Sequence, residues 1–140
     1  MVRFFLDSSF IIELLKNNKI AKDINNYLID ARSILLVYNH IVLSELIYQL
    51  YFKRKYNWQI IEEILKEFDL LELNKEIGSL SLEYIYKYNL RPNDALILAT
   101  CKHYGIKYLI SIDEDFATPC EKEGILLINS AEKLKEVLNK

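Results

Sequence analysis

The sequence has 140 residues, of which 51% are hydrophobic and 27% charged, and its formal net charge is −2 at pH 7. This length and composition are typical of one globular domain spanning residues 1–140, and they exclude collagen-like, low-complexity and disulfide-rich chains. The small negative charge gives no overall attraction for nucleic acid, so a bound polyanion would need a local basic patch or a metal ion.

Nothing in the sequence predicts secretion or membrane insertion. The apolar run at the amino terminus is too short for a signal peptide, and no apolar run approaches the roughly 18 residues of a membrane-spanning helix. Cys101 and Cys120 lack metal-ligand spacing, so we interpret them as ordinary thiols in a reducing compartment. We therefore expect a cytoplasmic protein.

Apolar runs and helical spacing alternate along the chain and predict its secondary structure. In chain order we expect a strand at 2–6, a helix from 10 to a break at 17–18, a helix at 20–31, a strand at 33–38, helices at 40–53 and 58–68, a short strand at 69–73, helices at 75–88 and 94–104, a strand at 108–112, a tight turn or single helical turn at 113–118, a strand at 125–128 and a helix at 130–138. Either Ser8 or Ser9 is expected to cap the first helix. The alternation of strands and helices indicates an α/β fold with a mostly parallel sheet covered on both faces.

Four carboxylates occupy related places in this pattern. Asp7 and Asp113 each follow an apolar strand, Asp94 opens an apolar helix, and Glu45 lies inside a helix without a basic partner one turn away. Strand ends and helix starts of a parallel sheet face one crevice, where such folds bind ligands. Carboxylates gathered there repel one another unless a cation lies between them, and oxygen ligands suit Mg²⁺ or Mn²⁺.

Each acid also has a purely structural interpretation. Asp7 and Asp94 suit the positive end of a helix dipole, and Glu45 can reach solvent. Asp113 and Asp115 can belong to a solvated turn, or Asp115 can ligate a second ion or cap that turn. The hydroxyl of Ser111 is placed to orient Asp113 or a bound water.

Four segments carry these acids in a recognisable order: residues 6–9, 44–46, 93–100 and 109–116. They resemble the four motifs of PIN-domain ribonucleases, above all the small VapC-type toxins of type II toxin–antitoxin systems. The resemblance covers nearly the whole chain, and its third and fourth segments are the most specific. The sequence departs at Ser111, where the family more often has threonine.

The resemblance implies a single PIN domain with about five parallel strands and helices on both faces. It implies an endoribonuclease that depends on Mg²⁺ or Mn²⁺, with Asp7, Glu45, Asp94 and Asp113 as catalytic and metal-binding residues. Asp115 is a further candidate ligand, and Ser9 and Ser111 are supporting residues. It also implies a cognate antitoxin and a homodimer, for which residues 20–31 and 40–67 are the candidate surfaces.

Lys53, Arg54 and Lys55 form a basic run among aromatic residues. This mixture suits single-stranded RNA, and it equally suits a solvated helix end beside core aromatics. Two other functions stay open: a metal-dependent phosphatase with Asp7 as nucleophile, and a non-catalytic module of the same fold that binds RNA or protein.

Overall fold

A computed structural model describes residues 1–139, so the last position of the predicted domain 1–140 lies outside the described part of the chain. Within that part, the strands are β1 (Val2–Leu6), β2 (Ile34–Tyr38), β3 (Asp69–Leu70), β4 (Tyr108–Ile110) and β5 (Leu126–Ile128). The α-helices are α1 (Ser8–Leu15), α2 (Lys19–Asp30), α3 (His40–Leu46), α4 (Trp58–Leu65), α5 (Lys75–Tyr88), α6 (Pro92–His103), α7 (Ala117–Glu123) and α8 (Ala131–Leu138). A π-helical segment, η1 (Ile47–Lys53), extends α3, and a 3₁₀ turn, η2 (Glu114–Phe116), precedes α7.

The five strands form one parallel sheet in the order β3-β2-β1-β4-β5. The central strand β1 pairs with β2 on one side and β4 on the other, so that Phe4 lies beside Leu36 and Tyr108. Phe4 and Phe5 are completely buried, which explains why this strand is apolar on both faces. The predicted parallel sheet of about five strands is confirmed.

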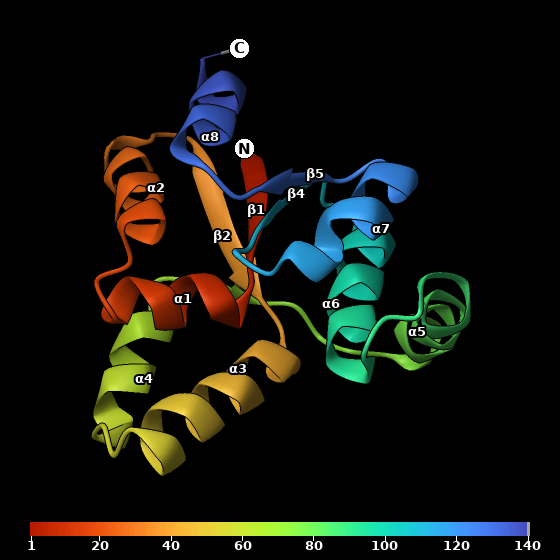
Figure 1. Cartoon of the computed structure of the whole chain (residues 1–140), viewed down its shortest axis with the longest axis horizontal. Helices are drawn as coiled ribbons and strands as arrows, with labels where there is room; N and C mark the ends of the chain where they lie inside the picture. Colours follow the sequence, from red (N-terminus) through yellow and green to blue (C-terminus); the bar gives the residue numbers. More distant parts are fainter. Residues whose placement is uncertain (140) are drawn as a thin grey trace.

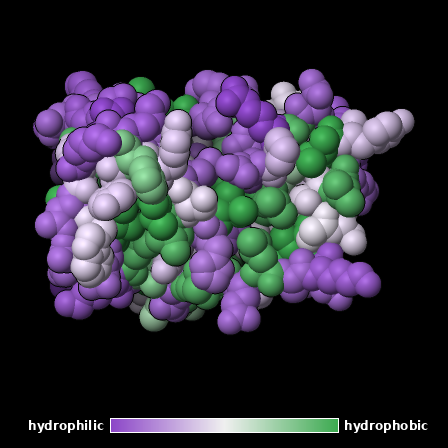
Figure 2. Space-filling view, turned by 90° about the horizontal axis from the view of Figure 1, so that it is seen from below, coloured by the Kyte–Doolittle hydropathy of each residue, from purple (hydrophilic) through white to green (hydrophobic). Residues whose placement is uncertain are grey.

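Helices cover both faces of the sheet, as the alternating pattern predicted. Figure 1 shows α1 and α2 on one side of the strands and α5, α6 and α7 on the other. Helix α8 returns to pack on α2. Helices α3 and α4 lie at the end of the molecule toward which β1 and β2 run (Figure 1). Figure 2 views the molecule from that end and shows groups of apolar side chains among polar ones.

Helix α6 is buried over most of its length, and its first turn opens onto the carboxyl ends of β1 and β4. Pro92 occupies its first position, where no backbone N–H is needed. Ala95 and Ala99 are completely buried, so the helix packs closely on its neighbours. These features hold Asp94, which is 8% exposed, at the edge of the core.

Helix α7 was not predicted from the sequence. The predicted single helical turn exists as η2, but the chain then continues as a regular helix to Glu123. Pro119 lies in the first turn of α7, where proline is tolerated. Glu123 accepts hydrogen bonds from the hydroxyls of Tyr84 and Tyr88, which fastens α7 to α5.

The start of α1 also differs from the prediction. The helix begins at Ser8, so Asp7 rather than Ser8 or Ser9 occupies the capping position. Asp7 makes no side-chain capping hydrogen bond, because its carboxylate is held by other partners described below. Among residues 1–139, no helix has the length and hydropathy required to cross a lipid bilayer.

Candidate active site

Asp7 lies at the end of β1 with its carboxylate fixed by two hydroxyl groups. Ser9 and Ser111 donate to Asp7 Oδ2 at 2.6 and 2.7 Å. Each hydroxyl also accepts a backbone N–H, from Ile112 at 3.1 Å for Ser9 and from Asp113 at 3.0 Å for Ser111. An accepted N–H leaves the hydroxyl proton free, so both protons point at Asp7. Ser9 and Ser111 therefore orient this carboxylate.

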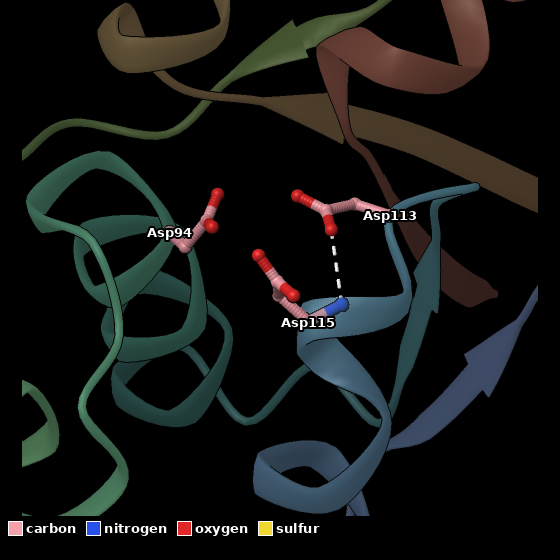
Figure 3. A group of neighbouring side chains, drawn as sticks. All are labelled: Asp94, Asp113 and Asp115. Carbon is pink, nitrogen blue, oxygen red and sulfur yellow. Dashed lines mark hydrogen bonds between the residues drawn. The ribbon is translucent and has the colours of Figure 1, made fainter.

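Asp94, Asp113 and Asp115 bring carboxylate oxygens within 4.8 Å of one another, one oxygen from each. Figure 3 shows the three side chains pointing into a common space, from α6, from the loop after β4 and from η2. Asp113 caps η2 by accepting the backbone N–H of Asp115 at 2.9 Å, as the dashed line in Figure 3 marks. Arg91 lies 4.0 Å from Asp115 at the outer side of this group.

The electrostatics of the site disfavour so many negative charges without a cation. Burial, followed by the neighbouring charges with Asp113 first among them, raises the pKa of Asp94 to about 7. Burial also raises the pKa of Asp7, against the opposing hydrogen bonds from Ser9 and Ser111. A divalent cation bound among these oxygens would favour the charged carboxylates.

Glu45 faces the same space from α3. The Ser8 hydroxyl donates to its carboxylate at 2.8 Å. Burial raises the pKa of Glu45, and the hydrogen bond from Ser8 acts in the opposite direction. The sequence showed no basic partner for Glu45 one turn away. In the structure its hydrogen-bond partner is Ser8, the first residue of α1.

Asn39, which was not predicted to have a role from the sequence, sets the position of α3 relative to α6. Its side-chain oxygen accepts the N–H groups of Ile41 and Val42 at 3.1 Å each, capping α3. Its side-chain nitrogen donates to Thr100 of α6 at 2.9 Å. Asn39 and Thr100 are completely buried, so the helices that carry Glu45 and Asp94 are joined inside the core. An asparagine directly before a helical run was the available signal.

The acids line one open cleft of about 460 Å³. Asp7, Glu45, Asp94 and Asp113 all contribute to its surface, as sequence reasoning predicted that they would meet. The remaining lining residues are Ser8, Ser9, Ile12, Ser44, Tyr48, Gln49 and Asn93. Tyr48 and Gln49 were missed as site residues; their positions one turn after Glu45 on the same helix were the available signal.

The basic run Lys53–Lys55 lies outside the cleft, at the exposed end of η1 and the loop after it. Lys53 Nζ is 5.9 Å from the centre of the Tyr48 ring, which lines the cleft. Tyr48 therefore lies between this basic run and the acids of the cleft.

The chain matches known proteins over most of its length. The PIN domain family model matches residues 4–122. The chain belongs to the PIN-domain family. Two relatives from Methanocaldococcus jannaschii are named Ribonuclease VapC2, which is 37% identical over 81% of this chain and 87% of the relative, and Ribonuclease VapC6, which is 31% identical over 80% of this chain and 89% of the relative.

Solved structures share the fold of this chain. The Rickettsia felis VapBC2 complex, bound to a DNA fragment from its promoter, gives a TM-score of 0.70 at 16% identity and covers 90% of this chain and 97% of that one. A toxin–antitoxin complex from Klebsiella pneumoniae gives a TM-score of 0.66 at 24% identity and covers 81% of this chain and 89% of that one. The predicted family and fold class are therefore confirmed.

Within this PIN domain, Asp7 is a poor candidate for a phosphatase nucleophile. Its side chain is nearly buried, with only 4% of the residue exposed. One of its oxygens is already engaged by two hydroxyls. This low exposure limits the approach of a phosphate to Asp7 and so argues against the nucleophile role.

Proposed function

We propose that this PIN domain is a metal-dependent endoribonuclease that hydrolyses RNA phosphodiester bonds, and that it acts as the toxin of a toxin–antitoxin pair. The observation that carries the proposal is the meeting of acids from four distant chain segments in one cleft. The names of the two Methanocaldococcus jannaschii relatives, both ribonucleases, support the same activity.

The donor set fits Mg²⁺ or Mn²⁺, since it consists of carboxylate oxygens in an open cleft. Asp94, Asp113 and Asp115 form the tightest group, and Asp7 and Glu45 complete the lining. A bound divalent cation activates water as a nucleophile near neutral pH and neutralises charge on the phosphate.

We assign a separate role in metal binding or catalysis to each side chain of this site. Asp94, Asp113 and Asp7 would hold the main ion, directly or through water, and Asp115 would add a further ligand. Glu45 would either ligate the ion or orient the attacking water as a base. Ser9 and Ser111 keep the Asp7 carboxylate in one orientation.

Removal of the metal tests this proposal directly. The purified protein, stripped with EDTA and dialysed, is expected to leave single-stranded RNA intact at pH 8. Added Mn²⁺ or Mg²⁺ should restore cleavage, and excess EDTA should stop it again. Products are followed on denaturing gels. Cleavage at an equal rate in EDTA, with metal content verified as negligible, would rule out a metal-dependent mechanism.

Loss of the Ser111 hydroxyl should weaken the site. Ser111→Ala removes one donor to Asp7 and leaves the Asp113 N–H without its acceptor. We expect a loss of about 1–2 kcal/mol in the free energy of unfolding. We also expect about tenfold weaker Mn²⁺ binding by calorimetry. Ser111→Thr keeps the hydroxyl and is the matched control. Equal Mn²⁺ affinity in the alanine and threonine variants would contradict the orienting role.

The basic run at residues 53–55 is proposed to hold the RNA backbone. The acids of the cleft repel phosphates, so an RNA strand bound there needs basic side chains beside the cleft. Reversing the charge of Lys53 and Arg54 to glutamate should weaken RNA binding most at low salt. The slope of log K against log salt should fall by about 0.7 for each lost phosphate contact. Binding is measured by fluorescence anisotropy.

The control for this test is charge reversal at Lys133 and Lys135 of α8, which lies at the other end of the molecule (Figure 1). It changes the net charge equally, and it should leave the salt dependence of RNA binding unchanged. An unaltered slope in the Lys53 and Arg54 variant would remove the basic run from the RNA-binding surface.

A protein partner is proposed from the apolar surface on the side of α1 and α2. A hollow of about 470 Å³ between α1, α2 and α4 is lined mainly by aliphatic and aromatic side chains. Beside it, Ile29 is 71% exposed. Such a groove suits the apolar face of an amphipathic segment from a cognate antitoxin. The exposed aromatics Tyr51, Phe52 and Trp58 offer surface for a homodimer.

A further inference from the structure

One wall of the acidic cleft carries an aromatic ring that has no part in holding a metal ion. Tyr48 and Gln49 line the cleft beside Glu45. Tyr48 is 58% exposed, so it is not a core side chain. Both residues belong to η1, which begins two residues after Glu45.

The π-helical form of η1 places a cation over this ring. Tyr48 and Lys53 are five residues apart, a spacing that does not share a face in an α-helix. In a π-helix, backbone hydrogen bonds join residues five apart, so Tyr48 and Lys53 project from the same side of η1. Lys53 Nζ accordingly lies 5.9 Å from the centre of the Tyr48 ring.

We propose that Tyr48 is a substrate-positioning residue, on whose ring one base of single-stranded RNA stacks while the adjoining phosphodiester lies at the acids. This inference rests on the proposed ribonuclease function. Lys53 would then face a phosphate of the same strand, and the Gln49 amide offers a donor and an acceptor to the base edge. A nucleotide combines the planar and anionic parts that these groups match.

The same geometry selects unpaired RNA. A base within a duplex has both faces covered by its neighbours, so it cannot lie on a side-chain ring without leaving the stack. Stacking of a base on an aromatic side chain contributes about 1–3 kcal/mol. Loss of the ring should therefore weaken substrate binding roughly 5- to 150-fold.

The test is steady-state cleavage of single-stranded oligoribonucleotides by the full chain with saturating Mn²⁺. Tyr48→Ala should raise KM roughly 5- to 150-fold, leaving kcat and Mn²⁺ affinity near the parent values, whereas Tyr48→Phe should stay within about twofold. Tyr27→Ala, which removes a 41% exposed tyrosine from α2, is the control and should not change KM. A scan of single abasic substitutions in the substrate should identify one position that weakens the parent strongly and Tyr48→Ala little.

The outcomes separate this inference from the function on which it rests. If the parent protein cleaves RNA and Tyr48→Ala has the parent KM, the stacking role is overturned. If Tyr48→Ala loses kcat and Mn²⁺ affinity with KM unchanged, the ring supports the metal site, which also overturns the inference. Failure of the parent to cleave any RNA with Mn²⁺ refutes the ribonuclease proposal and the inference with it.

Discussion

Replacement of Asp94 by asparagine is expected to abolish RNA cleavage while the fold stays intact. Asp94 supplies the most buried carboxylate of the three-acid group. Asparagine has the same shape but no charge, so the site loses one anionic ligand. Changing only an outer partner of a metal ligand already weakens metal binding or activity by about 10- to 100-fold. Loss of a direct ligand should therefore reduce cleavage by at least about 100-fold.

The same substitution should stabilise the metal-free protein at pH 8. The pKa of Asp94 is raised, which means that its charged form is less favourable in the folded protein than in water. Asparagine removes that unfavourable charge. We expect the free energy of unfolding to rise by about 1 kcal/mol in urea denaturation, since the cleft is open and solvent weakens the repulsion. Loss of activity together with a gain in stability would separate a functional role for Asp94 from a structural one.

Asp23→Asn is the matched control for this substitution. Asp23 lies on α2 and pairs with Lys19 at the surface, 3.0 Å away. Its replacement should leave cleavage unchanged and stability within about 0.5 kcal/mol of the parent. Cleavage by Asp94→Asn at the parent rate would show that the acid group is not the catalytic site.

Apolar runs and turn residues predicted most of this fold because both reflect local preferences. Residues 4–6 are apolar because both faces of β1 are buried there, and the observed α5 agrees with the predicted helix at 75–88. The sequence also predicted that Asp7 and Asp113 would meet, because both follow strands of a parallel sheet.

The missed features depend on contacts between distant residues. Ser8 and Ser9 looked like helix caps, but their hydroxyls bind Glu45 and Asp7, and local sequence cannot reveal such partners. Tyr48 looked like one more aromatic residue in an apolar helix. In the structure, its 58% exposure and the π-helical turn that brings Lys53 over its ring distinguish it from a core residue.

The metal-free protein is expected to lose stability as the pH rises from about 4 to about 7. The pKa of Asp94 is about 7 in the fold, against about 4 in an unfolded chain. The folded state therefore holds the proton more tightly, so the stabilising contribution is complete below about pH 4 and lost above about pH 7. Burial raises the pKa values of Asp7 and Glu45 in the same direction.

The size of this effect follows from the pKa difference and the openness of the cleft. A difference of about three pH units corresponds to about 4 kcal/mol. Solvent in the open cleft reduces this to about 1–2 kcal/mol. Urea denaturation in EDTA at a series of pH values measures it. Asp94→Asn should have a visibly flatter profile, because it lacks a carboxyl group whose pKa is raised to about 7 in the fold. A profile that rises between pH 4 and 7 would contradict the electrostatic description.

Mn²⁺ should reverse this loss, because a cation among the carboxylates favours their charged forms. At pH 8 and a Mn²⁺ concentration about 100 times Kd, binding adds about 2.7 kcal/mol to the free energy of unfolding. For a chain of this size the thermal midpoint should rise by roughly 5–10 °C. The rise should shrink at pH 5, where protons compete for the same oxygens, and it should nearly vanish in Asp94→Asn. A rise of equal size in that variant would mean that Mn²⁺ binds elsewhere. A cation held by these acids would bind more weakly once Asp94, the most buried carboxylate of the group, is lost.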